Sequence, residues 1–444
     1  MQVILTNVGQ RWCQHQARTL PMPDLPRGIT LLQWKLLLEL MKGKVVTPDG
    51  EVDPLLARGL VEIPAQPMDE AALGLRLRRN PLEHIRRVSI EFTTACASHC
   101  LHCRNAARPA VTEDDPGRLF PAVDLMLDLG LRRFDFIGGE VLQFGDGWLE
   151  VVRRIRRRKD ARVAVLTSGW FLERSDFTAA GRGYATDLAL MKDLALEGVT
   201  HLVFSLDGPQ PVHDRWRGAP GLYRRVLDGF GKARRTGLIP QVSTISRTLG
   251  NDPEVLRWLL EVAAALYPET ARGTPAALME RLHRDPQNHF SSLVDLGGAA
   301  VLRRGRLQLH QALDADLPCK AFYRPGHSLR LGADGEVSTC PLMGDAPGFG
   351  NLRDRSLLDI LNRMQETPLF RLNAEGGLAR FRPLLDPRFF PGGIDHVCTL
   401  RVALNRLALL MLGRGTDPGD AASVRAMNEA VAGEMGERLF KWNG

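Results

Sequence analysis

The chain lacks any uninterrupted apolar run of the roughly 18–20 residues that a membrane-spanning helix needs. Its most apolar stretch, Leu400–Leu412, contains Arg401, Asn405 and Arg406, and therefore predicts an amphipathic helix of a soluble domain. The first residues also lack the basic start and the long apolar core of a secretion signal. We therefore expect a cytoplasmic protein that does not engage a membrane.

Cysteine is scarce and odd in number, with seven residues at positions 13, 96, 100, 103, 319, 340 and 398 of the 444-residue chain. A cytoplasmic chain is kept reduced, and an odd count leaves one thiol without a partner, so a disulfide framework is not expected. Thiolates that bind a metal centre or take part in catalysis are the better interpretation.

Basic residues outnumber acidic ones by 58 to 51, which gives a net charge of +7. The densest basic run, Arg153–Lys159, would be compatible with nucleic-acid binding. However, Leu149, Val152 and Ile155 repeat at helical spacing, and no aromatic side chains are interleaved with the arginines. The run therefore predicts the solvated face of one amphipathic helix, and no nucleic-acid partner is expected.

Residues 1–85 form a first unit. Ile29–Met41 has the pattern of a helix that Thr30 caps, and it is followed by a short segment, Val52–Gly59, and a strand, Leu60–Ile63. This order predicts a small winged-helix-like module.

Residues 86–310 alternate short β-branched or aromatic runs with helical stretches, at a period of about 40 residues. The expected strands are Val88–Thr93, Phe134–Ile137, Arg162–Thr167, His201–Leu206 and Gln241–Ile245. The expected helices are Leu119–Leu129, Trp148–Arg158, Tyr184–Leu196, Leu222–Arg235 and Glu254–Leu266. The alternation predicts an α/β fold, with parallel strands in an open sheet or a barrel.

Residues 311–444 change class again. His327–Leu331 and Glu336–Cys340 flank a turn at Gly332–Gly335, which is a hairpin signal, and Ser356–Gln365 has the pattern of a helix. We expect a separate α+β unit that carries the last three cysteines, and we find no internal repeat.

Cys96, Cys100 and Cys103 form a C-x3-C-x2-C motif directly after the first strand of the α/β region. Three thiolates on one loop can hold a metal centre, but they are one short of the four that structural zinc or a closed iron–sulfur cluster prefers. Three ligands on a four-iron cluster would leave one iron open to another molecule. Non-ligating cysteines and an incomplete zinc site are the alternatives.

With this motif the sequence resembles the radical S-adenosylmethionine (AdoMet) enzymes, in which it follows the first strand of a partial (β/α)6 TIM-like barrel. His102 occupies the position at which that family usually has an aromatic residue. The resemblance implies that Cys96, Cys100 and Cys103 are metal ligands and catalytic residues that hold a [4Fe-4S] cluster. It further implies that AdoMet binds the open iron and is cleaved to a 5′-deoxyadenosyl radical.

Three further segments at strand ends resemble the same family. Gly138-Gly139-Glu140 matches its glycine-rich AdoMet-binding segment, and Ser168 lies in the polar Thr167–Gly169 element after the third strand. Glycines permit a close backbone approach, and Glu140 can pair with the AdoMet ammonium.

The third segment begins with Ser205-Leu206-Asp207-Gly208 at the end of the fourth strand, and Arg217 follows it. This block is similar to radical AdoMet enzymes that modify peptides and proteins. The resemblance implies that Ser205 and Asp207 reach the AdoMet carboxylate or ribose and that Arg217 pairs with the carboxylate. All of these candidates follow strand ends, where a barrel places its chemistry.

The C-terminal unit resembles the SPASM/twitch extensions of this family, which bind auxiliary [4Fe-4S] clusters. Cys319, Cys340 and Cys398 would be the ligands, and too few cysteines remain for two auxiliary clusters. One cluster is feasible, with an open iron, His396 or another side chain in the fourth position. Cys13 is left over and is interpreted as an ordinary cysteine.

The resemblance implies a radical enzyme that abstracts hydrogen from a precursor peptide or a protein, and it leaves a cross-link, an epimerisation or an oxidation as outcomes. The N-terminal module would bind a leader peptide by strand addition, or would serve as a structural cap. A reductant such as flavodoxin or ferredoxin would be a second partner. Two alternatives stay open: the same chemistry on a sugar, nucleotide or antibiotic precursor, and a non-catalytic iron–sulfur or zinc protein.

Overall fold

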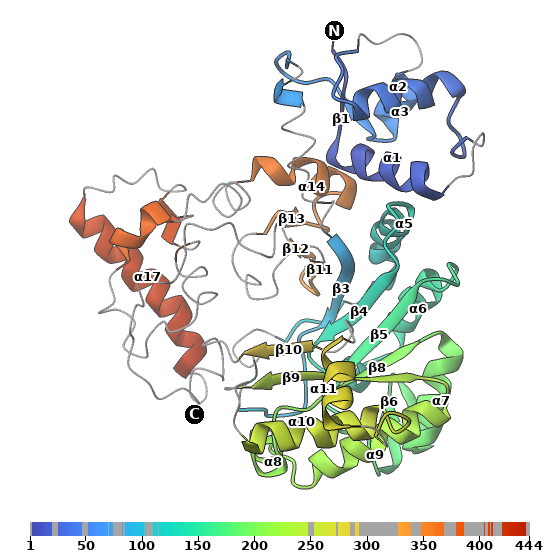
Figure 1. Cartoon of the computed structure of the whole chain (residues 1–444). Helices are drawn as coiled ribbons and strands as arrows, with labels where there is room; N and C mark the ends of the chain where they lie inside the picture. The colour runs from blue at the N-terminus through green and yellow to red at the C-terminus, as the bar shows by residue number, and fades with distance from the viewer. Residues whose placement is uncertain are drawn as a thin grey trace.

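Figure 1 shows the computed structural model of the chain. The residues that the structure describes are 2–19, 25–46, 52–69, 71–73, 82, 85–101, 103, 110–113, 115–246, 253–271, 274–284, 289–292, 327–338, 348–367, 379–385, 404, 407–408, 410–411 and 420–440.

A nine-stranded sheet forms the centre of the molecule, in the order β10-β9-β8-β5-β4-β3-β11-β12-β13. Its parallel series is β3 (Ile85–Thr93), β4 (Arg133–Gly138), β5 (Arg162–Thr167), β8 (His201–Ser205), β9 (Ile239–Ser246) and β10 (His289–Ser292). Each strand pairs with the next one of this series without a reversal of direction. Because crossover connections are right-handed, such an order puts all connecting helices on one face, as in a barrel.

The connecting helices are α5 (Phe120–Asp128), α6 (Gly147–Ile155), α7 (Asp187–Glu197), α8 (Gln210–Arg217), α9 (Leu222–Arg235), α10 (Pro253–Leu266) and α11 (Pro275–Arg284). Figure 1 shows α5, α6 and α7 along the same side of the strands. The fold is therefore the expected α/β partial (β/α)6 barrel, and the five predicted strands are all present.

Alternation along the strands decides what faces the helices. Ile90 of β3 pairs with Phe136 of β4, and the Phe136 ring lies 5.4 Å from the ring of Trp148 on α6. Since successive side chains point to opposite faces, Glu91 projects toward the concave side instead. The apolar residues thus pack under the helices, and polar side chains are left for the inside of the barrel.

One predicted helix starts later than the sequence indicates. Tyr184–Leu196 was expected to be helical, but Tyr184 lies in β7 (Arg182–Thr186), which pairs with β6 (Ser175–Ala179) in an antiparallel hairpin. Thr186 has an extended backbone and its side chain accepts a hydrogen bond from the Ala189 amide. This cap is what fixes the start of α7 at Asp187.

The basic run lies at the C-terminal end of α6, which ends at Ile155 rather than at Arg158. Arg153 Nε donates to Glu197 at 2.7 Å, and Arg154 Nε donates to Asp124 at 2.7 Å. These partially exposed ion pairs agree with the solvated face that the sequence predicts. Among the described residues, none of the helices combines the length and the apolar character that a membrane crossing requires.

The N-terminal module consists of β1 (Ile4–Leu5), α1 (Asn7–Thr19), α2 (Leu31–Met41), α3 (Asp53–Ala57) and β2 (Val61–Glu62), with β1 antiparallel to β2. Thr30 caps α2 as predicted: its side chain accepts from the Gln33 amide, and the Gln33 side chain accepts from the Thr30 amide. Helix α1 was not anticipated. It fixes the module to the barrel, because Arg11 Nη1 donates to the Leu82 carbonyl at 2.9 Å, just before β3.

The C-terminal part begins with β11 (His327–Leu331), which runs parallel to β3, and continues with β12 (Glu336–Ser338) and β13 (Gly350–Asn351). The predicted hairpin is present, and Gly335 at its turn has a φ of 84°. The hairpin continues the central sheet beside β3. Helices α14 (Leu357–Arg363) and α17 (Ala421–Phe440) follow it.

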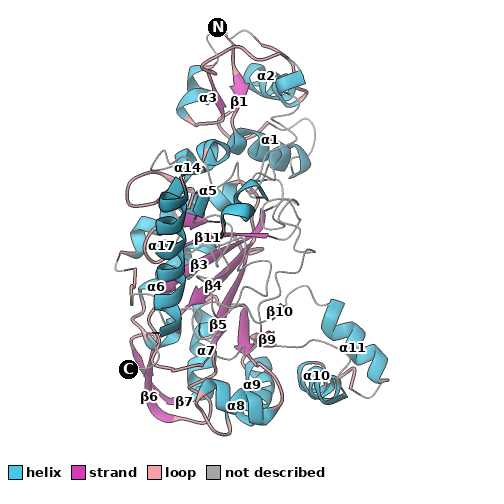
Figure 2. Cartoon of the chain, turned by 90° about the vertical axis from the view of Figure 1, so that its left-hand side faces the viewer, coloured by secondary structure: helices cyan, strands magenta, loops and turns pink. Residues whose placement is uncertain are grey.

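Figure 1 and Figure 2 both show α14 between the N-terminal module and the rest of the molecule. Asn7 of α1 donates to the Leu361 carbonyl of α14 at 3.0 Å, and Asn362 donates to the Gly59 carbonyl at 3.2 Å. The module therefore rests on both the barrel and the C-terminal part.

Candidate functional site

The three cysteines of the motif lie on the loop that leaves β3. Cys100 is buried, Cys96 and Cys103 are half-buried, and all three thiols are free. The Ser98 amide donates to Cys96 Sγ at 3.3 Å, and the Cys103 amide donates to the Cys100 carbonyl at 3.0 Å, so the loop folds back on itself. Burial raises the pKa of the Cys96 thiol to about 11 and also raises that of Cys100. Iron would therefore displace protons from these thiols when it binds.

The C-terminal end of helix α8 contacts this loop. The Leu101 amide donates to the Trp216 carbonyl at 2.8 Å, and Arg217 Nη1 donates to Cys100 Sγ at 3.6 Å. Within the described residues, no group of three His, Cys, Asp or Glu side chains is gathered closely enough to hold a single metal ion. The thiolates of a four-iron cluster bind three different irons, so their spacing differs from that of the ligands of one ion.

Asp207 and Arg217, both predicted from the sequence, are brought together. Arg217 Nε donates to Asp207 Oδ2 at 2.7 Å, and the Asp207 carboxylate is 1% exposed. Burial alone would lower the pKa of Arg217, but Asp207 and Cys100 outweigh it and the pKa lies above its usual value. The pair therefore carries its charges and links the end of β8 to the cysteine loop. Ser205, half-buried at the end of β8, pairs in register with Ser243.

Asp207→Asn is expected to lower the free energy of unfolding by about 3 kcal/mol, because it leaves the Arg217 guanidinium, whose side chain is 12% exposed, without its anion. Glu429→Gln is the matched control, since it removes a carboxylate that pairs with Arg425 at the exposed surface, where such a pair contributes less than about 1 kcal/mol. Denaturant unfolding of both variants measures the difference. Equal losses in the two variants would contradict the role given to the buried pair.

The glycine-rich segment packs directly on the backbone that precedes Cys96. The Gly139 amide donates to the Thr93 carbonyl at 2.8 Å, and the Glu140 amide donates to the Ala95 carbonyl at 3.0 Å. A Cβ atom on Gly139 would stand 1.8 Å from the Ala95 carbonyl oxygen, and Gly138 has a φ of 127°. Only glycine fits this approach, as the sequence predicts.

Glu140 is 1% exposed, and its two carboxylate oxygens differ in their contacts. Oε2 accepts hydrogen bonds from Thr167 Oγ1 at 3.0 Å, from the Ser168 amide at 2.8 Å and from Ser168 Oγ at 2.9 Å. Oε1 is buried and has no hydrogen-bond partner. Burial raises the pKa of Glu140 to about 6, against the opposing effect of these hydrogen bonds, so the group is mostly ionised at pH 7. An orphaned, negatively charged oxygen beside a close-packed glycine segment fits a cationic group such as an ammonium.

The structure thus gathers most of the predicted residues around the cysteine loop. Gly138, Gly139 and Glu140 contact its start, and Arg217 contacts Cys100. Ser168 lies in contact with Glu140, so it supports that carboxylate from behind. The predicted residues His102, Cys319, Cys340, Cys398 and His396 lie outside the described residues.

Two features of the site were not anticipated. Thr167, adjacent to the predicted Ser168, also donates a hydrogen bond to Glu140. Its hydroxyl directly before Ser168-Gly169 is the sequence feature from which this contact could have been predicted. Arg330 of β11 donates to Glu91 of β3, and both side chains are fully buried. These two residues are 239 positions apart, so no local pattern could have paired them.

Comparison with protein families gives two matches. The model of the radical SAM superfamily matches residues 90–263, and that of SPASM, an iron–sulfur cluster-binding domain, matches residues 319–381. The first match contains the cysteine motif, the glycine segment and Arg217, and the second contains β11 to β13 and α14.

Two curated relatives are similar to part of the chain. An AdoMet-dependent heme synthase of Methanosarcina barkeri is 27% identical over 191 residues, which is 41% of this chain and 49% of that protein. An AdoMet-dependent heme synthase of Nitratidesulfovibrio vulgaris is 25% identical over 160 residues, or 35% of this chain and 39% of that protein. The chain therefore matches half or less of the length of these relatives.

Among solved structures, Streptococcus suis SuiB aligns with a TM-score of 0.45 and 12% identity, over 76% of this chain and 75% of that one. SuiB bound to its precursor peptide SuiA aligns with a TM-score of 0.43 and 13% identity, over 72% and 76% of the two chains. These scores are too low to transfer a function. The first family match, by contrast, contains the site, and the chain therefore has a radical SAM domain and a SPASM domain, for which AdoMet and [4Fe-4S] clusters are the cofactors.

Proposed function

We propose that this radical SAM enzyme abstracts a hydrogen atom from a peptide or protein and so starts a post-translational modification. The proposal rests on the N-terminal module. In the described part of the chain, five of the exposed large apolar side chains belong to this module. They are Leu25, Leu31, Leu32, Val45 and Ile63, and they are 38 to 59% exposed. Exposed apolar side chains on a small module beside the catalytic domain offer apolar contacts to a protein or peptide partner.

Strand β2 makes the module suited to an extended peptide. In the described residues the partner strand of β2 is β1, on one side; we propose the other side of β2 as the docking edge, and Ile63 just beyond it is 43% exposed. A peptide added to this edge would gain main-chain hydrogen bonds and apolar contacts. The surplus of basic residues over acidic ones would favour an acidic leader segment, with an attraction that added salt weakens.

We assign the site residues as follows. Cys96, Cys100 and Cys103 hold the cluster, and the backbone of Gly138 and Gly139 with Glu140 Oε1 binds the AdoMet ammonium. Thr167 and Ser168 orient Glu140, while Asp207 and Arg217 secure the cysteine loop; Ser205 and His102 stay candidates for AdoMet contact. When bound at the reduced cluster, AdoMet would supply a 5′-deoxyadenosyl radical able to take one hydrogen atom from a C–H bond.

The substrate radical can then lose an electron and a proton, as a cross-link or an oxidation requires, or take back a hydrogen atom, as an epimerisation requires. We propose that Cys319, Cys340 and Cys398 would hold an auxiliary cluster, with His396 or an open iron in the fourth position, and that this cluster would supply the electron acceptor that the first case needs. We further propose that flavodoxin or ferredoxin reduces the enzyme in the cytoplasm, and that the domains span residues 1–85, 86–310 and 311–444.

The decisive experiment measures 5′-deoxyadenosine formation by the reduced enzyme with and without a peptide encoded beside its gene. We expect the peptide to stimulate formation of 5′-deoxyadenosine and to change its own mass or stereochemistry. The same peptide without its leader segment is the control and should stimulate less. No stimulation by any neighbouring peptide would contradict a peptide substrate.

A small-molecule substrate is the second candidate, because the curated relatives are named heme synthases. Stimulation of AdoMet cleavage by a tetrapyrrole precursor, and not by a peptide, would favour it. This candidate gives the N-terminal module no substrate to hold.

Glu140→Gln is expected to weaken AdoMet binding about tenfold or more, because Oε1 loses the charge that pairs with the ammonium. The pKa of about 6 implies that wild-type affinity falls as the pH is lowered from 7 to 5, whereas the variant should show a smaller change. Anaerobic titration with AdoMet measures both effects. Asp135→Asn is the control, since this buried carboxylate near the start of β4, the strand that precedes Glu140, pairs with Arg87 of β3. Equal weakening in both variants would remove the role assigned to Glu140.

A further inference from the structure

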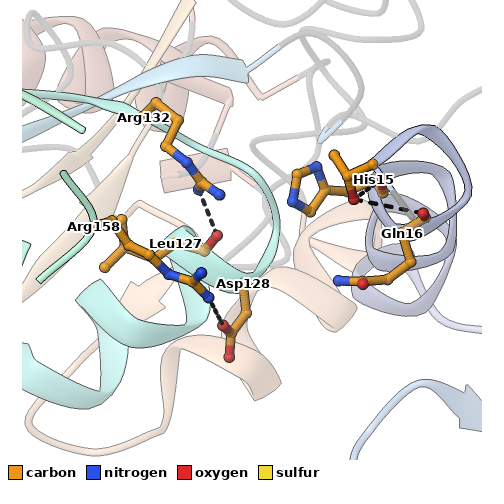
Figure 3. Close-up of a pocket in the computed structure, with 7 residues that line it drawn as sticks. His15, Gln16, Leu127, Asp128, Arg132 and Arg158 are labelled. Carbon is orange, nitrogen blue, oxygen red and sulfur yellow. Dashed lines mark hydrogen bonds and ion pairs between the residues drawn. The ribbon is translucent and has the colours of Figure 1, made fainter. Parts of the chain in front are cut away.

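A cavity of about 260 Å³ lies between α1 of the N-terminal module and the barrel. Its lining residues are His15, Gln16, Thr19, Leu127, Asp128, Arg132 and Arg158. Figure 3 shows His15 and Gln16 of α1 facing Arg132 and Asp128 on the barrel side. Sites for drug-sized ligands usually measure about 300–1,000 Å³, so this cavity suits a group of roughly side-chain size. None of the residues assigned to AdoMet or the cluster lines it.

Arg132 lines the cavity, but its guanidinium already donates hydrogen bonds to other protein groups. Nη1 donates to the Leu127 carbonyl at 2.7 Å and to the Leu131 carbonyl at 2.9 Å, while Nε donates to Asp160 Oδ2 at 2.7 Å. These contacts cap the C-terminal end of α5 and fix the side chain in place.

Arg158 is bound much more loosely. Its Nη2 lies 3.7 Å from Asp128 Oδ1, which is within ion-pair range but too long for a hydrogen bond, and its side chain is 54% exposed. The guanidinium therefore keeps donors that can turn toward a ligand in the cavity. Such a planar group binds a carboxylate through two parallel hydrogen bonds.

His15 contributes a polar but uncharged wall. Its ring packs on Gly130, where an added Cβ would lie 2.5 Å from Nδ1, so the missing side chain makes room for the imidazole. Burial lowers the pKa of His15, and Arg132, Arg11 and Arg158 lower it further, while Asp128 acts in the opposite direction. The ring is therefore neutral at pH 7 and can exchange hydrogen bonds with a ligand. The Gln16 amide and the Thr19 hydroxyl add further polar groups.

Asp160 already balances the charge of Arg132, so Arg158, which meets Asp128 only at ion-pair distance, is the lining cation whose donors are open to a ligand. One carboxylate matches the two parallel donors of this single guanidinium. We propose that the cavity binds the carboxylate of a side-chain-sized group, such as a glutamyl or aspartyl residue of the peptide substrate. A free short-chain carboxylic acid shares this chemistry. The assignment of this carboxylate to the peptide substrate rests on the proposed function.

An anchor at this position would hold the substrate where the module meets the barrel. The cavity lies next to the contact that Arg11 of α1 makes with the Leu129 carbonyl at 3.2 Å, in the same loop as Gly130. A bound acidic residue would thus contact both parts at once and tighten their docking. The gain in docking is independent of radical chemistry, so binding can be measured without turnover.

The test is calorimetric titration of the anaerobic holoenzyme with N-acetylglutamyl methylamide and, separately, with glutarate. N-acetylglutaminyl methylamide is the uncharged control ligand. Arg158→Gln should weaken binding of the glutamyl probe about tenfold or more, because it removes the charged donor. Arg157→Gln is the matched control variant: it removes the same charge from the neighbouring exposed residue, which does not line the cavity, and should change affinity less than about twofold.

Binding of the glutamyl probe alone, with loss in Arg158→Gln, supports the site with a peptide as the source of the carboxylate. Binding of both probes with the same loss supports the site with a free acid as an equal source. No saturable binding of either probe below about 10 mM, equal binding of the glutaminyl control, or equal losses in the two variants would overturn the proposal. Saturable binding without peptide-stimulated AdoMet cleavage would refute the peptide substrate while leaving the carboxylate site in place.

Discussion

Replacing Cys96, Cys100 and Cys103 together with alanine is expected to remove about four irons per chain and to abolish AdoMet cleavage. The three thiols lie on one loop behind β3, and the chain offers that cluster no other cysteine there. Without the cluster, AdoMet has neither an iron to bind nor a source of the electron that breaks its sulfonium bond. Iron analysis and the yield of 5′-deoxyadenosine measure the two losses.

Cys13→Ala is the matched control for this triple variant. Cys13 is a free, fully buried cysteine of α1, and burial raises its pKa to about 12, so it behaves as a small apolar side chain. We expect its replacement to leave iron content and cleavage unchanged. Cleavage that survives in the triple variant would contradict the assignment of the motif, and loss of iron in Cys13→Ala would show that iron content reports on folding.

Gly139→Ala is expected to reduce AdoMet cleavage by two orders of magnitude or more. The added methyl group would overlap the Ala95 carbonyl oxygen, which stands 1.8 Å from the Cβ position, and backbone cannot rotate away as a side chain can. Relief of the clash must shift either the loop that starts at Cys96 or the Gly138–Glu140 segment. A displacement of about 1 Å in such a site can cost a factor of about 100 in rate.

Gly145→Ala provides the comparison, since no atom lies within 4 Å of its Cβ position and the residue is exposed. This variant should keep wild-type cleavage and stability. The yield of 5′-deoxyadenosine at saturating AdoMet, together with the melting temperature, separates a local distortion of the site from general unfolding. Wild-type cleavage by Gly139→Ala would show that the close backbone approach is dispensable.

The strands and helices of the barrel could be predicted because residues close in sequence carry their signals. The β-branched and aromatic run Val88–Thr93 and the apolar spacing of Leu222–Arg235 are signals carried by residues close in sequence, and the structure has β3 and α9 at these positions. Helix α1 escaped prediction because part of its support is remote: Asn7 bonds to the Leu361 carbonyl, 354 residues later in the chain. Long-range contacts of this kind leave no periodic signal.

In the site, too, contiguous motifs could be predicted and long-range contacts could not. The cysteine spacing and the glycine segment are contiguous motifs, so their positions could be predicted, and the structure brings them into contact through the Gly139 and Glu140 amides. The support of Glu140 by Thr167, and the pairing of Glu91 with Arg330, depend on strand order and register instead. Register between strands emerges only when the sheet is assembled.

The position of the N-terminal module sets a minimum spacing within any peptide that uses both ends of the barrel. Arg11 of α1 contacts Leu82 and Ile85 at the start of β3, whereas the cysteine loop begins after Thr93 at its end. The nine residues of β3 span about 30 Å at roughly 3.3 Å per residue. A peptide held at the module therefore needs about nine extended residues before its reactive C–H bond reaches the radical. The enzyme would thus select the modified residue by counting from the anchor, and would pass over identical residues placed closer to it.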